Sequence, residues 1–129
     1  MSAVSISCPV FPSEDPERVR QAVLNIFPDA DLDMSDGTLS GETDSVEHFG
    51  AQIRRQRILD AVRSVLIKGR RGGNITFNLN KQAAFAGKIS FAEEKTILGT
   101  IRVTLRSDDI TSFIEKLAPQ TVDGEEVFV

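Results

Sequence analysis

The sequence predicts a two-layer α+β domain, in which a mostly antiparallel sheet carries helices on one face. Three observations lead to this prediction. Apolar and polar residues alternate over short segments, apolar residues recur at helical spacing between those segments, and short turns join consecutive strands. At 129 residues and 14.1 kDa the chain has the length of one ordinary domain, and we expect a single domain over residues 1–129.

The N-terminal part of the chain predicts a strand, a helix and a hairpin. Over residues 3–10 apolar residues alternate with serines and prolines, as in a half-buried strand. Asp15 is a good N-cap residue and Pro16 fits the first helical position, so a helix begins there and ends at Pro28. A further strand then turns back at Asp36-Gly37, a pair that is typical of tight hairpins.

A long helix is predicted over residues 46–68. Asp44 and Glu47 have the spacing of a capping box, and Gly69 ends the helix. At about 100° per residue, the apolar residues of its first half point to a different side from those of its second half. We therefore expect two neighbours to cover this helix, one of which could be a second subunit.

The rest of the chain predicts short elements separated by turn residues. We expect a strand over 75–79, a short helix over 81–86 with Asn80 at its N-cap, strands over 88–92 and 97–106 joined across 93–96, and a last helix capped by Ser107 and ended by Pro119. Residues 118–129 are expected to be a loose tail or a short edge strand that turns at Asp123-Gly124.

The composition argues against several functional classes. No apolar stretch approaches the roughly 20 residues that span a bilayer, and the first residues lack the pattern of a signal peptide, so we expect a cytoplasmic protein. One cysteine and one histidine, Cys8 and His48, cannot form an internal disulfide or a zinc site of such ligands. Neither a Walker motif nor a dinucleotide-binding glycine motif occurs. We predict a protein that is not an enzyme and uses no cofactor or metal.

The net charge of −4 is distributed unevenly along the chain. Residues 1–49 hold two basic and ten acidic side chains, residues 50–106 hold twelve basic and three acidic ones, and residues 107–129 hold one basic and six acidic ones. Such blocks predict a polarised surface. The middle block therefore indicates a local site for a polyanion on a protein that is acidic as a whole.

Two features of the middle block carry this prediction. Arg54 and Arg57 lie on one side of the long helix, and Asp60, the acid within reach of its arginines, cannot neutralise all four of them. Arg70 and Arg71 stand between glycines at the end of that helix. They form either a phosphate-binding loop or the ordinary basic end of a helix.

Four segments resemble a small archaeal family of the uncharacterised UPF series, grouped with predicted RNA-binding proteins: 11–19 (FPSEDPERV), 25–30 (NIFPDA), 54–64 (RRQRILDAVRS) and 79–91 (LNKQAAFAGKISF). The resemblance covers nearly the whole chain. It implies a fold like that of the ribosomal protein that binds 5S rRNA, and a homodimer. It brings no catalytic motif with it.

The first hypothesis is therefore an RNA-binding protein that recognises the shape and phosphates of a structured RNA. Its expected site residues are Arg54, Arg57, Arg70, Arg71, Lys81, Gln82 and Lys88. The second hypothesis is a protein-interaction or structural dimer whose basic face meets an acidic partner. The third is a small-ligand or cation-dependent enzyme that uses the carboxylates of residues 29–36, for which the alternative is a solvated strand face.

Overall fold

The structure is a computed structural model that describes residues 3–92, 99–119, 121–122 and 125–126. A six-stranded sheet has the order β2-β3-β1-β6-β5-β4, and every neighbouring pair in it is antiparallel. The elements are β1 (Ala3–Pro9), α1 (Pro16–Ile26), β2 (Asp31–Ser35), β3 (Thr38–Thr43), α2 (Glu47–Gln56), α3 (Leu59–Lys68), β4 (Arg70–Arg71), β5 (Asn74–Leu79), α4 (Lys81–Phe85), β6 (Ile101–Arg106), α5 (Ile110–Leu117), β7 (Thr121–Val122) and β8 (Glu125–Glu126).

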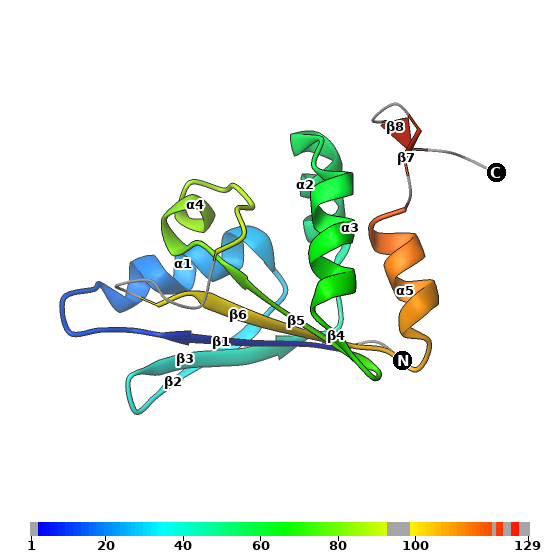
Figure 1. Ribbon diagram of the computed structural model, residues 1–129. Coiled ribbons are helices and arrows are strands. Elements are labelled where there is room, and N and C mark those ends of the chain that lie inside the picture. Colours follow the sequence, from blue (N-terminus) through cyan, green and yellow to red (C-terminus); the bar gives the residue numbers. More distant parts are fainter. Residues whose placement is uncertain (1–2, 93–98, 120, 123–124, 127–129) are drawn as a thin grey trace.

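The helices lie on one side of the sheet, which confirms the predicted α+β class (Figure 1). Alternate residues of β1, β5 and β6 are buried under them, as period-2 strands require. A row of phenylalanines joins the two layers: the rings of Phe27 and Phe49 are stacked at 5.4 Å, and those of Phe49 and Phe77 at 5.7 Å. The opposite face of the sheet, called the open face below, carries the remaining, mostly polar side chains of the strands.

The first third of the chain folds as its sequence predicts. The side chain of Asp15 accepts a hydrogen bond of 3.0 Å from the backbone N–H of Glu17, and Pro16 opens α1. Asp36 and Gly37 have φ angles of 50° and 76°, the left-handed conformation that a two-residue hairpin needs. The predicted strand, helix and hairpin are therefore confirmed.

The prediction of one long helix over residues 46–68 is wrong, because Arg57 interrupts the helix. This residue has a φ angle of 58°, ends α2, and lets α3 begin two residues later. Each short helix then buries its own apolar side, which explains the change of buried face without a second subunit. The capping box is also wrong: the N-cap of α2 is Val46, which has no side-chain hydrogen bond to the helix, and the Glu47 N–H donates to the Ser45 hydroxyl at 3.4 Å instead of to Asp44.

The segment after α3 differs from the prediction at three points. Arg70 and Arg71 form the short edge strand β4 instead of a free loop. The predicted strand over 88–92 is replaced by a single bridge between Leu79 and Phe91. Asp109, not Ser107, is the N-cap of α5, and its carboxylate accepts from the Ser112 N–H at 3.1 Å.

The short helix α4 is confirmed, with Asn80 at its N-cap. In the C-terminal tail, β7 and β8 pair with each other in a separate two-stranded sheet. The predicted connection over 93–96 and the turn at Asp123-Gly124 lie outside the described residues. Within the described ranges, the helices are all too short or too polar to cross a lipid bilayer.

Candidate nucleic-acid interface

The structure does not bring the seven predicted site residues together. Gln82 lies on α4 with Lys81, at one end of the molecule, whereas β4 lies at the other end (Figure 1). Arg57 precedes the ten residues of α3 and Arg70 follows them. At about 1.5 Å per residue, α3 holds these two arginines roughly 15 Å apart. The predicted site is thus divided among separate places on the molecule.

Lys81 is not available to a phosphate, contrary to the prediction. Its side chain is only 9% exposed, and its ammonium group donates to Glu14 Oε1 at 2.9 Å and to the Pro9 carbonyl at 2.6 Å. A buried charge needs such a partner, and removing either group would leave the other charge buried and unpaired. Lys81 is a structural residue that ties α4 to the segment between β1 and α1.

The residues at the end of α2 form a second group with Lys88. The side-chain amide of Gln56 accepts from the Ile89 N–H at 2.7 Å and donates to the Ile89 carbonyl at 3.0 Å, so it holds the 87–90 segment as a strand would. Lys88 is exposed next to this contact. Arg54 points the other way, and donates to the backbone carbonyl of Lys116 on α5 at 3.4 Å.

The hairpin of β4 and β5 fixes Arg70 and Arg71. The Arg70 guanidinium donates to Thr111 Oγ1 at 3.1 Å, and that of Arg71 donates to the Lys68 carbonyl at 3.2 Å. A Cβ on Gly69 would lie 2.2 Å from the Thr76 carbonyl oxygen, so only glycine allows α3 to end this close to β5. The two guanidiniums are therefore positioned by contacts to uncharged oxygens, which leave their charge in place.

The strand register adds arginines that the sequence-based site omitted. Arg71 pairs with Asn74, and Asn74 pairs with Arg106, so these three side chains form one row across the open face. Arg102, which pairs with Asn78, lies further along β6, the strand that holds Arg106. The alternation of arginines with buried residues in Ile101–Arg106 is the signal that could have found them.

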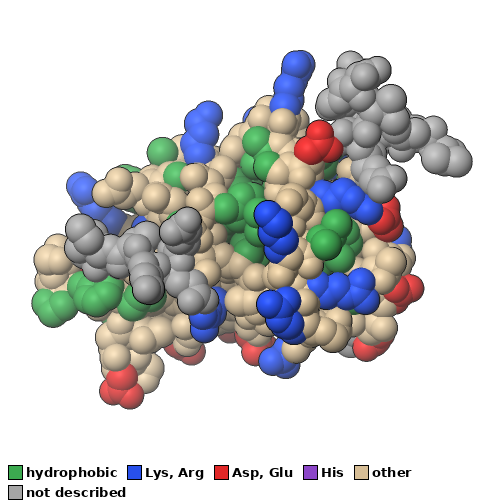
Figure 2. All heavy atoms as spheres, viewed as in Figure 1, with side chains coloured by type: hydrophobic (Ala, Val, Ile, Leu, Met, Phe, Trp, Pro, Cys, Tyr) green, Lys and Arg blue, Asp and Glu red, His purple; other side chains and the backbone are tan. Residues whose placement is uncertain are grey.

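We call Lys68, Arg70, Arg71 and Arg106 the basic corner. All four are exposed and lie where α3, β4 and β6 meet. Figure 2 shows several Lys and Arg side chains over the half of the molecule that holds α3, β4 and α5. Asp31 and Asp33 project from the open face at the far edge strand. At about 4.8 Å per strand, that edge is roughly 24 Å from β4, well beyond the screening length at physiological salt.

One cation near this region is neutralised. Arg63 on α3 donates to Glu115 Oε1 on α5 at 2.7 Å. This hydrogen bond and the guanidinium charge lower the pKa of the Glu115 carboxyl. Arg63 therefore joins α3 to α5, and we leave it out of the basic corner.

The acidic residues of 29–36 do not converge on a cation site. Asp31 and Asp33 are on the open face, and Asp36 is in the hairpin turn. Among the residues that the structure describes, no group of three or more His, Cys, Asp or Glu side chains could hold a metal ion.

An α+β domain with an exposed group of cations at one edge of its sheet has a surface of the kind that binds polyanions. Residues 3–107 of the chain match the model of a protein family described as RNA binding. Relatives extend this match. The chain is 35% identical to a UPF0201 protein of Methanothermobacter thermautotrophicus over 98% of both chains. It is 39% identical to a UPF0200/UPF0201 protein of Archaeoglobus fulgidus over 96% of this chain and 39% of that longer protein.

The chain belongs to the archaeal UPF0201 family. A crystal structure of the UPF0201 protein from Methanococcus jannaschii is similar, with a TM-score of 0.92, 40% identity and coverage of 98% of this chain and 99% of that one. The family and the fold class predicted from the sequence are thus confirmed. The likeness to the 5S rRNA-binding ribosomal protein, the homodimer and the cytoplasmic location stay predictions.

Proposed function

We propose that the protein binds structured RNA by contacting phosphates with the basic corner. The observation that carries the proposal is the row of Arg71, Asn74 and Arg106 on the open face, with Arg70 and Lys68 on the helix side of the same sheet edge. Guanidinium groups bind phosphate oxygens in a forked geometry, which makes arginine the usual residue for this contact. The description of the matching family agrees with this function.

The open face also supplies neutral hydrogen-bonding groups beside the cations. Asn74 and Asn78 alternate with the buried residues of β5, and Thr104 of β6 pairs with Thr76. Amide and hydroxyl side chains can contact sugar hydroxyls, which distinguish RNA from DNA. In sheet-type RNA-binding domains, aromatic residues on the sheet stack on bases. The open-face positions of β1, β5 and β6 carry no aromatic residue. We therefore expect the basic corner to recognise shape and phosphates with little dependence on base sequence.

The test is the salt dependence of binding to a structured RNA. Four phosphate contacts give a slope of log K against log salt of about −3, so affinity should fall about 50- to 150-fold between about 50 mM and about 200 mM salt. A double change, Arg71→Ala with Arg106→Ala, should reduce the slope by about 1.5, because two contacts are lost.

A charge-matched control separates local binding from overall charge. Arg57→Gly with Lys88→Ala also removes two exposed cations, but at the far end of α3. This control should leave the slope unchanged. The proposal is wrong if RNA does not bind at about 50 mM salt, where counterion release favours it most. It is also wrong if both double variants lower the slope equally.

The second hypothesis makes a different prediction for the same surface. If the basic corner binds an acidic protein, a pull-down should recover that protein after nuclease treatment, and the Arg71→Ala, Arg106→Ala variant should lose it. Recovery that nuclease abolishes supports the RNA proposal instead.

A further inference from the structure

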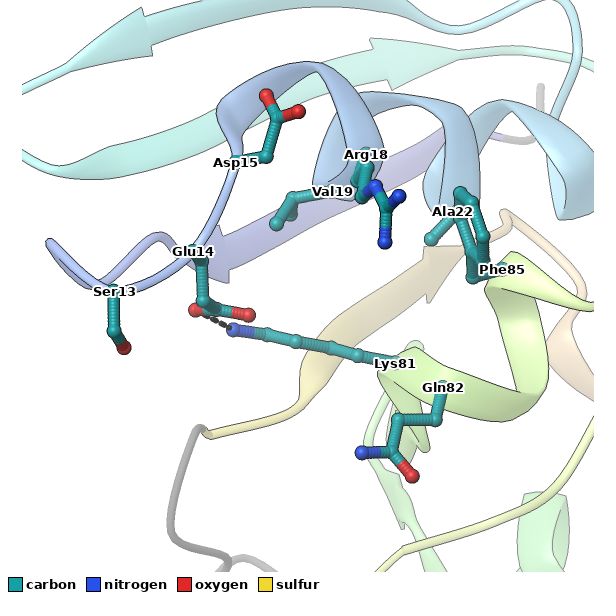
Figure 3. A pocket seen from close by; sticks show the side chains of 9 residues that line it. All are labelled: Ser13, Glu14, Asp15, Arg18, Val19, Ala22, Lys81, Gln82 and Phe85. Carbon is teal, nitrogen blue, oxygen red and sulfur yellow. Dashed lines mark hydrogen bonds and ion pairs between the residues drawn. The ribbon is translucent and has the colours of Figure 1, made fainter.

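A cavity of about 530 Å³ opens between α1 and α4 (Figure 3). These two helices lie over the opposite end of the sheet from β4 (Figure 1). Helix α4 is held against α1 by Asn25, whose side-chain amide donates to the carbonyls of Ala84 and Phe85, each at 3.0 Å. The volume is within the range of about 300–1,000 Å³ that is usual for small-molecule sites.

The sides of this cavity are apolar and include an exposed aromatic ring. Val19 and Ala22 of α1 and Phe85 of α4 line it, and Phe85 is 46% exposed. Among the described phenylalanines only Phe11 and Phe85 are exposed, and both lie at this end of the molecule. An exposed ring beside a cavity is a surface on which a planar ligand can stack.

A guanidinium group lies over this ring. The Cζ atom of Arg18 lies 5.6 Å from the centroid of the Phe85 ring, across the cavity from α1 to α4. Figure 3 shows both side chains directed into the space between the helices. Aromatic rings and arginine guanidinium planes are the two groups on which proteins stack unpaired nucleobases.

The other end of the cavity carries a fixed pair of hydrogen-bonding groups. The Glu14 carboxylate and the Lys81 ammonium form their ion pair here, with side chains 12% and 9% exposed (Figure 3). Lys81 and the backbone N–H of Phe11 both donate to Glu14 Oε1, at 2.9 and 3.1 Å. Because both bonds use the same oxygen, Oε2 can still accept a hydrogen bond from a ligand.

We propose that this cavity binds the base of a ribonucleotide. The base stacks against Phe85 and Arg18, and an exocyclic amino group of the base donates to Glu14 Oε2. The Glu14 and Lys81 charges balance each other, which suits a neutral, planar ligand with polar edges better than a compact anion. This inference stands on the lining of the cavity and does not depend on RNA binding by the basic corner.

Fluorescence of 2-aminopurine riboside 5′-monophosphate provides the first test. The chain contains neither Trp nor Tyr, so the emission of the probe is free of protein background, and stacking quenches it. We expect saturable quenching with a dissociation constant on the order of 0.1–1 mM, reversed by adenosine or cytidine monophosphate and less well by uridine monophosphate, which lacks the amino group. Quenching that does not saturate, or that these competitors do not reverse, overturns the proposal.

Variants of the stacking groups provide the second test. Phe85→Leu keeps the apolar bulk but loses the aromatic face, and Arg18→Ala removes the guanidinium. Each should weaken binding about tenfold, whereas Lys88→Ala, an exposed change outside the cavity lining, should have no effect. Equal affinities in all these variants would show that the probe binds elsewhere.

A third comparison identifies the source of the base. A single-stranded oligoribonucleotide that binds more tightly than the monophosphate indicates an unpaired nucleotide of RNA, and one that does not compete indicates a free nucleotide. The Arg71→Ala, Arg106→Ala variant should bind the monophosphate as the unaltered chain does. Loss of RNA binding at the basic corner and failure of this cavity to bind a base are therefore separate results.

Discussion

Replacing Lys81 by methionine should destabilise the protein by about 3 kcal/mol. The change keeps an unbranched side chain as far as the ε-carbon but leaves the nearly buried carboxylate of Glu14 without its partner. It also removes the 2.6 Å hydrogen bond to the Pro9 carbonyl. Breaking a buried ion pair typically costs about 3–5 kcal/mol, and the 12% exposure of Glu14 to the cavity places this case at the lower end.

Urea unfolding followed by circular dichroism measures this effect, with Gln82→Met as an exposed control on the same helix. The control should change stability by less than about 0.5 kcal/mol. Adding Glu14→Gln to Lys81→Met removes the unpaired buried charge and should recover about 1–2 kcal/mol of the lost stability. The reasoning is refuted if Lys81→Met costs under about 0.5 kcal/mol, or if the double variant is less stable than either single one.

Three further predictions concern the backbone and the core. Arg57→Gly should raise the free energy of unfolding by about 1 kcal/mol in urea, because glycine adopts a φ of 58° without strain. Gly69→Ala should lower it by about 2 kcal/mol or more in the same assay, because the added Cβ would lie 2.2 Å from the Thr76 carbonyl oxygen. Burial raises the pKa of the Cys8 thiol from 9.0 to about 11. The unfolded thiol therefore ionises first as the pH rises, and stability should fall by about 2 kcal/mol between pH 9 and about 11, but not in Cys8→Ala.

The parts of the fold that the sequence predicts correctly are governed by local chemistry. Asp15 and Pro16 begin α1, Asp36-Gly37 forms a turn, and period-2 strands need one buried face. The break at Arg57 could not be predicted in this way, since arginine is a good helix former and rarely adopts a positive φ. There the packing of α2 and α3 on different neighbours decides the conformation.

The candidate site was only partly predictable for a related reason. The sequence predicts Arg70 and Arg71 as site residues because glycines flank them, but Arg106 comes from a strand distant in sequence, and only the register places it in one row with Arg71. Lys81 was misassigned because its partner, Glu14, lies 67 residues away in the chain. Charge counts along a sequence show how many cations a segment has, and the three-dimensional pairing decides which of them remain available.

The central claim is that cations at the ends of α3, β4 and β6 contact RNA. Ultraviolet crosslinking in native cells, followed by mass spectrometry of peptides that carry a nucleotide, tests it most directly. We predict crosslinked residues within 68–74 and 102–106, which nuclease treatment before irradiation should abolish. Crosslinks confined to other segments, or no crosslinked peptides from a protein recovered in good yield, would contradict the claim.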